Sequence, residues 1–180
     1  PTFATGLPSL SLTYGYTGGP WPLAYRGMGE LFVFLFFGLM AVAGTVFIQT
    51  GGWHPEAFLL GGQVGLLSTV LISINNLRDR AEDTLSNKRT LAVRLGEKGG
   101  RLLIVAEVAL AFAVSFLWFL SGVPWLAAVC LPILLLGLPL VRGITGGVAG
   151  SGLNRFLVLG SVLLMAFATA IQIITLLTGG

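Results

Sequence analysis

The chain has 180 residues, of which 55% are hydrophobic and only 9% are charged, and its net charge is +3. An ordinary soluble domain has about 25% charged residues, so this composition excludes a water-soluble protein and indicates one that lies mostly within a membrane. The small positive charge implies no nucleic-acid partner, because membrane topology accounts for where the basic residues lie.

Five apolar stretches approach or reach the length of about 17–25 residues that a bilayer-spanning helix needs. In chain order they are Leu31–Gln49, Ala57–Ile74, Leu102–Leu120, Val123–Val141 and Phe156–Leu177. No loop between them is long enough for a soluble domain. The sequence therefore predicts an all-α, polytopic transmembrane helix bundle of about five spans, forming a single domain over residues 1–180.

Several residues inside these stretches predict how the helices pack. Gly61 and Gly65 have the GxxxG spacing that allows close helix contact within one bundle. Gln63 and Gln172 are expected to make hydrogen bonds between helices. The fourth stretch should be kinked or broken, because it contains three prolines, at positions 124, 132 and 139.

The basic residues predict the orientation of the bundle. If residues 75–101 face the cytoplasm, alternating spans place all ten Lys and Arg residues on that side, and the loops Thr50–Glu56 and Ser121–Gly122 contain none. This distribution is what the positive-inside rule requires. We therefore expect a multi-pass protein of the cell membrane whose segment 75–101 is cytoplasmic.

Residues 75–101, called the polar loop below, hold 11 of the 17 charged side chains. If the second helix continues past Ile74, then Asn75, Asp79 and Asp83 line one face at i, i+4 spacing, with Asn76 beside them. Carboxylate and amide oxygens of this kind suit Mg²⁺, which leaves its other positions for water and substrate phosphates.

Basic residues further along the polar loop suit phosphate oxygens, since Arg offers paired donors and Lys a compact charge. They are Lys88, Arg89 and Arg94. The polar loop is thus a candidate diphosphate site. The alternative is a solvated helix face with weak ion pairs, and from spacing alone both interpretations stay open. For Arg94 and Arg101, contact with anionic lipid headgroups is a further alternative. Glu107 is expected at the membrane interface, and a position facing the cavity is its alternative.

The segment INNLRDRAEDTLSNKRTLAVRLG, residues 74–96, resembles the second aspartate-rich motif of the UbiA family of intramembrane prenyltransferases. YTGGPWPLAYRGMGELFVFLFFG, residues 16–38, resembles a loop and helix of the same family. The likeness is strongest to its menaquinone-pathway branch, whose motif reads NNxRDxxxD followed by GKxTLxVRLG. Asn87 stands where that motif usually has Gly, a minor departure because Asn also tolerates a left-handed turn.

The resemblance implies a nine-helix bundle in which two aspartate-rich motifs each bind one Mg²⁺. No NDxxD motif precedes Asp79, so the chain is expected to correspond to the C-terminal five helices, with the N-terminal helices of the same enzyme as their partner. The implied metal residues are Asn75, Asn76, Asp79 and Asp83, and Asp79 and Asp83 are also the implied catalytic residues. The implied diphosphate contacts are Lys88, Arg89, Arg94 and Arg78.

The implied reaction transfers a polyprenyl group from polyprenyl diphosphate to 1,4-dihydroxy-2-naphthoate, with loss of CO₂ and diphosphate, to give demethylmenaquinol. A homogentisate, phytyl, haem or chlorophyll-directed transferase of the same family is the nearest alternative. From another class, a transporter or non-catalytic membrane scaffold would place ionisable residues near the bilayer midplane. Charges clustered at one membrane surface argue against that class.

Overall fold

A computed structural model describes residues 26–178, in which every regular element is a helix. Five helical spans are long and apolar enough to cross a membrane: Gly29–Thr50, Pro55–Arg78, Leu91–Leu120, Pro124–Thr145 and Gly150–Thr178. The predicted all-α bundle of five spans is confirmed. The largest difference in boundary is at the third span, which begins at Leu91 and not at the predicted Leu102.

The spans are built from α-helices joined to short π and 3₁₀ segments. The first three spans contain α2 (Gly29–Val33), the π-helix η2 (Phe34–Met40), α3 (Ala41–Thr50), α4 (Pro55–Arg78), α6 (Leu91–Val114) and the 3₁₀-helix η3 (Ser115–Leu120). The remaining elements are α5 (Arg80–Leu85), the 3₁₀-helices η4 (Pro124–Val129) and η5 (Gly150–Leu153), α7 (Cys130–Thr145) and α8 (Asn154–Thr178). The proline-rich fourth span is a 3₁₀ segment followed by an α-helix, as the prolines predict.

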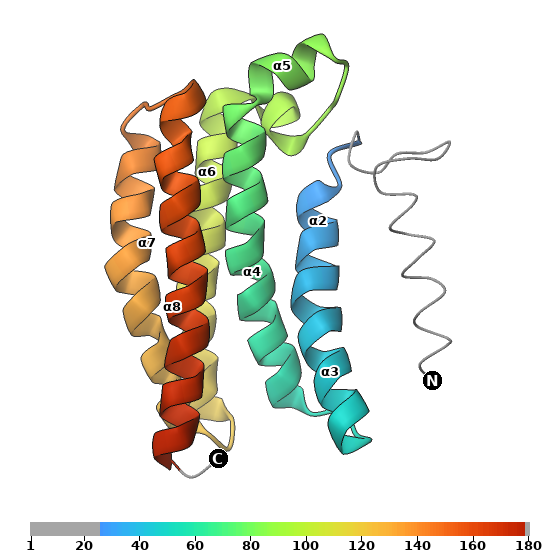
Figure 1. The fold of residues 1–180 in the computed structure, drawn as a ribbon, viewed down its shortest axis with the longest axis vertical. Coiled ribbons are helices and arrows are strands. Elements are labelled where there is room, and N and C mark those ends of the chain that lie inside the picture. The colour runs from blue at the N-terminus through green and yellow to red at the C-terminus, as the bar shows by residue number, and fades with distance from the viewer. Residues whose placement is uncertain (1–25, 179–180) are drawn as a thin grey trace.

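Helix α4 is the centre of the bundle and its most buried span. It packs against α6 and α8 on one side and against α2, η2 and α3 on the other, and Figure 1 shows α2 and α3 standing apart from α7 and α8 with α4 between them. The polar loop joins α4 to α6 through α5 at one end of the bundle. Helix α4 therefore connects the polar loop to both halves of the fold.

All ten basic residues lie toward the end of the bundle that carries α5 (Figure 1). Arg26 precedes α2, Arg142 lies in the last turn of α7, and Arg155 lies in the first turn of α8. The turns at the opposite end contain no Lys or Arg. The structure thus confirms that the spans bring the bases to one end.

Glycines allow the backbones of η2 and α4 to touch. A Cβ atom at Gly38 would lie 2.5 Å from the carbonyl oxygen of Gly61 and 2.5 Å from the Cα of Gly65, and one at Gly65 would lie 2.8 Å from the Phe34 ring. Real Cβ atoms do not approach this closely. The prediction of close packing at Gly61 and Gly65 is confirmed, and their partner is a helix of the same chain.

Gln63 makes the predicted hydrogen bonds between helices. Its Nε2 donates to Ser115 Oγ at 2.9 Å and to the Ala111 carbonyl at 3.3 Å, while Trp118 Nε1 donates to its Oε1 at 2.7 Å. Gln63 and Trp118 are fully buried. Gln172 is exposed and faces outward from α8. The prediction that it makes a hydrogen bond to another helix is therefore wrong.

We expect Gly38→Ala to destabilise the protein by about 1–3 kcal/mol, because the added methyl group overpacks the contact between η2 and α4. Gly44→Ala is the matched control on the same span, since a Cβ there meets nothing within 4 Å. Because Ala is the better helix former, the control should keep or raise the midpoint of thermal unfolding in detergent. Equal midpoints for both variants would contradict the close contact.

Gln63→Leu should destabilise the protein by about 1–3 kcal/mol, because it leaves the buried Trp118 N–H without an acceptor. The same substitution at the exposed Gln172 should change stability by less than about 0.5 kcal/mol. Thermal unfolding of both variants, with near-ultraviolet circular dichroism of Trp118, measures the difference. A Gln63→Leu variant as stable as Gln172→Leu would refute the network.

Candidate functional site

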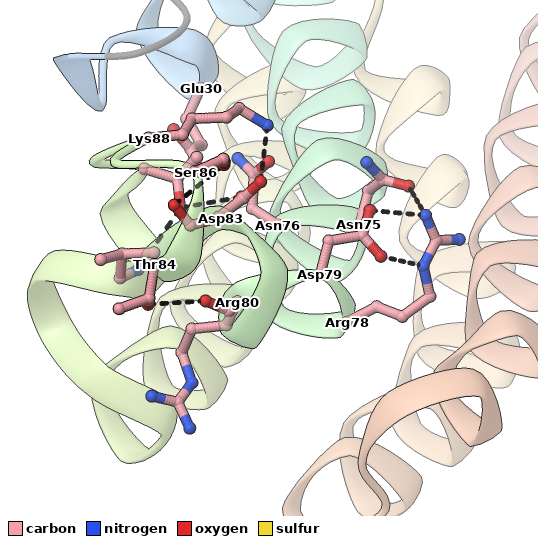
Figure 2. Close-up of polar contacts among 12 residues, drawn as sticks. Glu30, Asn75, Asn76, Arg78, Asp79, Arg80, Asp83, Thr84, Ser86 and Lys88 are labelled. Carbon is pink, nitrogen blue, oxygen red and sulfur yellow. Dashed lines mark hydrogen bonds and ion pairs between the residues drawn. The ribbon is translucent and has the colours of Figure 1, made fainter.

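Asn75, Asp79 and Asp83 were expected on one face of a continuous helix, but the structure interrupts that helix. Helix α4 ends at Arg78, Asp79 has φ −91° and ψ 6°, and α5 begins at Arg80. The amide of Asp79 still donates to the Asn75 carbonyl and the amide of Asp83 to the Asp79 carbonyl. The chain bends at Asp79, however, and Figure 2 shows the two carboxylates in separate groups.

The first group joins Asn75, Arg78 and Asp79. Arg78 donates from Nε and Nη2 to the two carboxylate oxygens of Asp79 at 2.6 and 2.7 Å, and from Nη2 to Asn75 Oδ1 at 2.6 Å. Its Nη1 donates to Asn154 Oδ1 at the start of α8, at 2.9 Å. All three guanidinium nitrogens of Arg78, an expected diphosphate contact, are thus bonded within the protein. The hydrogen bond from Arg78 holds the pKa of the Asp79 carboxyl below its ordinary value.

A left-handed turn after α5 brings Lys88 back to Asp83. The amide of Lys88 donates to the Asp83 carbonyl at 2.8 Å, and that of Asn87 to the Thr84 carbonyl at 3.3 Å. These are the two bonds of a Schellman motif. Asn87 has φ 57° and is the one non-glycine residue with positive φ among residues 26–178. The expectation that Asn87 can replace Gly in a left-handed turn is confirmed.

The second group is centred on Asp83, which is buried although it lies in the polar loop. Lys88 Nζ donates to Asp83 Oδ1 at 3.1 Å, and the Thr90 hydroxyl donates to Oδ2 at 3.4 Å. Thr90 also caps α6, because its Oγ1 accepts from the amide of Val93. The cap of α6 and the Schellman turn therefore fix the same carboxylate from two directions.

Asn76 joins the second group through an acid that the sequence analysis did not place in the site. Asn76 Nδ2 donates to Oε1 of Glu30, near the start of α2, at 2.9 Å. In Figure 2 Asn76 is drawn on the same side of α4 as Asp83 and Lys88. The predicted ligands thus form two sets, Asn75 with Asp79 and Asn76 with Asp83, and each set includes a basic residue.

Glu107 does not lie at the membrane interface, as had been expected. It is buried, and its Oε1 accepts from the Ser73 hydroxyl of α4 at 2.8 Å. The prediction was wrong because α6 begins earlier than the apolar stretch. Since Glu107 lies ten residues beyond Glu97, it is about 15 Å further along the helix.

The remaining basic residues differ in their surroundings. Arg89 and Arg94 are exposed, and Arg94 Nε donates to the Arg89 carbonyl at 3.1 Å. Arg101 is buried and bonds to the Ile144 carbonyl, to the Val148 carbonyl at 2.7 Å and to Glu97 Oε1 at 2.6 Å. Arg101 therefore ties α6 to the end of α7, and the lipid-headgroup alternative for it is wrong.

The carboxyl and amide oxygens of the two groups are of the kind that binds a hard divalent cation. The first group offers one carboxylate and one amide, and the second offers Asp83, Glu30 and one amide. Within residues 26–178 no three His, Cys, Asp or Glu side chains converge. Mg²⁺ commonly takes one or two carboxylates and fills its other positions with water and phosphate oxygens. The two groups have the composition expected for that chemistry.

Comparison with known proteins identifies the family. Residues 1–146 match the model of the UbiA prenyltransferase family. The chain belongs to this family. The match includes the whole polar loop and ends beyond α7, so it covers both groups of candidate ligands.

Named relatives of this UbiA-family chain include three 1,4-dihydroxy-2-naphthoate octaprenyltransferases. That of Bacillus subtilis is 35% identical over 71% of this chain and 42% of its own length, and that of Haemophilus influenzae is 41% identical over 61% and 38%. That of Mycobacterium tuberculosis is 37% identical over 80% of this chain and 50% of its own length. The alignments thus span half or less of these relatives. No solved structure matches the chain.

We expect Asn87→Gly to keep the stability of the protein and Asn87→Val to lower it by about 1–2 kcal/mol, because a β-branched residue is strained in the left-handed region. Ser86→Val, at the preceding exposed residue with φ −85°, is the control. Thermal unfolding and limited proteolysis of the polar loop check this. If the Val variants at 86 and 87 behave alike, the left-handed turn is not present.

Proposed function

We propose that the full-length protein transfers a polyprenyl group from polyprenyl diphosphate to 1,4-dihydroxy-2-naphthoate, with loss of CO₂ and diphosphate. The observation that carries this proposal is the pair of carboxylate–amide groups at the basic end of an apolar bundle, in a segment shared with the naphthoate octaprenyltransferases. The groups supply oxygens for a cation, neighbouring bases supply donors for phosphate, and the spans supply a surface for a hydrocarbon tail.

The residues of the polar loop take two roles in this proposal. Asp79 and Asp83, with Asn75 and Asn76, hold Mg²⁺, which would stabilise the negative charge that develops on the diphosphate oxygens. Lys88, Arg89 and Arg94 contact the diphosphate directly. The guanidinium group of Arg78 holds Asp79 and Asn75 in place. For Arg78 to contact the diphosphate, as the resemblance implies, these hydrogen bonds would have to break.

The reaction breaks one bond, forms another and then loses a carboxyl group. The allylic C–O bond ionises, and its electron pair leaves with the diphosphate, whose charge Lys88, Arg89 and Arg94 offset. The electron-rich ring carbon that carries the carboxylate then bonds to the carbocation. The bond from this carbon to the carboxylate breaks, CO₂ leaves, and the electron pair of that bond returns to the ring. The polyprenyl tail lies along exposed apolar side chains of the first span, among them Phe37 and Met40.

The protein is proposed to lie in the cell membrane with its polar loop in the cytoplasm. This orientation rests on the ten basic residues at one end of the bundle and on the positive-inside rule. It places the two ligand groups at the water-facing surface, where a charged diphosphate arrives.

A second candidate uses the same site with a phytyl donor. The chain is 26% identical over 65% of its length to the 2-carboxy-1,4-naphthoquinone phytyltransferase of Synechocystis. Both candidates need the same ligand groups and differ only in the hydrocarbon that the apolar faces accept. Assays with each diphosphate donor separate them.

We expect Asp79→Asn and Asp83→Asn each to lower prenyl transfer to dihydroxynaphthoate by at least about a hundredfold, the scale of losing one group that stabilises transition-state charge. Glu82→Gln is the matched control, because Glu82 lies between them in sequence but is exposed. Product formation in membranes with added Mg²⁺ and polyprenyl diphosphate is measured. Near-normal activity of either Asn variant would contradict its assignment as a metal ligand.

A further inference from the structure

Glu30 is a buried acid whose place in the structure is not explained by the packing of apolar side chains. It is only 5% exposed, and within residues 26–178 its one hydrogen bond is the one that Oε1 accepts from Asn76. Among the described residues, the buried side-chain oxygens without a hydrogen-bond partner are Glu30 Oε2 and Glu107 Oε2. A buried carboxyl group with an unpartnered oxygen costs stability, so a role of Glu30 is to be sought in the side chain that bonds to it, Asn76.

The position of Glu30 is set by contact with the polar loop. Just before α2, Gly27 has φ 70°, and a Cβ atom there would lie 2.8 Å from the Arg89 carbonyl and 3.2 Å from Arg94 Nε. The backbone that leads into α2 therefore rests directly on the segment that follows Lys88. This contact places Glu30, the second residue of α2, against Asn76 of α4.

The hydrogen bond to Glu30 fixes which way the Asn76 amide points. An amide has a donating end, Nδ2, and an accepting end, Oδ1. Because Asn76 Nδ2 donates to Glu30 Oε1, Asn76 Oδ1 points away from Glu30. In Figure 2 Asn76, Asp83 and Lys88 are drawn on the same side of α4.

We infer that Glu30 is a positioning residue that presents Asn76 Oδ1, together with the Asp83 carboxylate, to a divalent cation. This inference rests on the proposed function, because it assigns a role within the same metal site. Partners that orient metal ligands are part of the site's affinity, and their loss typically lowers it about 10–100-fold. Glu30 acts here from a different helix than the ligand it orients.

The test is the affinity of the full-length protein in nanodiscs for Mn²⁺, followed by electron paramagnetic resonance without substrate. Asp83→Asn first defines the site that depends on Asp83. Glu30→Ala should weaken that site about tenfold or more, and Glu30→Gln should keep its affinity close to normal, because the Gln carbonyl still accepts from Asn76 Nδ2. Equal losses in the Ala and Gln variants would overturn positioning and indicate that the charge of Glu30 acts directly on the cation.

A double-mutant cycle with Asn76→Leu tests whether Glu30 acts through Asn76. In the Asn76→Leu protein, Glu30→Ala should cause no further loss of Mn²⁺ affinity. A further tenfold loss there would overturn the inference. Thermal unfolding without Mn²⁺ is measured for every variant, and only variants with a cooperative transition enter the comparison.

The outcomes separate this inference from the function on which it rests. If Asp83→Asn leaves Mn²⁺ binding unchanged, the metal site itself is refuted. If Asp83→Asn removes a binding site and Glu30→Ala does not weaken it, the role of Glu30 is refuted and the metal site stands.

Discussion

The hydrocarbon of a bilayer offers no hydrogen-bond partner, so polar groups in these spans have to be satisfied inside the protein. Several of these polar groups lie on helix α4. Gln63 bonds to α6 and η3, Ser73 bonds to Glu107 of α6, and Asn76 bonds to Glu30 of α2. These four bonds, from three residues of α4, join the central helix to its neighbours at three depths. The same constraint excludes charged side chains from most of the bundle surface and gathers them at one end.

At that end, water is available, and the structure uses close pairs of opposite charge. Arg78 bonds to Asp79 and Lys88 to Asp83 at 2.6 and 3.1 Å. Asp83 is buried and the other three side chains are half-buried. The consequence of each pair is geometric, because the base holds one carboxylate in place. A third chain of contacts, from Arg80 through Glu97 to Arg101, links α5 to α6 and then to the end of α7.

Composition and hydropathy predicted the class of fold, the number of spans and the gathering of bases at one end, because these depend on transfer of whole segments into lipid. The spacing of Gly61 and Gly65 predicted close packing, but not that Gly38 is the partner. The bend at Asp79 and the pairing of Asn76 with Glu30 were not predictable from periodicity. Both depend on which helices meet, and Glu30 is 46 residues before Asn76 in sequence.

The Schellman turn at Asn87 has a consequence for how the candidate site folds. Helices α4, α5 and α6 form one continuous hairpin, and its short connection brings Asp83, Lys88 and Thr90 together by local chain closure. Contacts between residues close in sequence form quickly, because little chain entropy is lost. The bonds between Asp83, Lys88 and Thr90 therefore need only a short segment of chain to close. The Asp79 group differs, because the bond from Arg78 to Asn154 joins residues that are 76 positions apart.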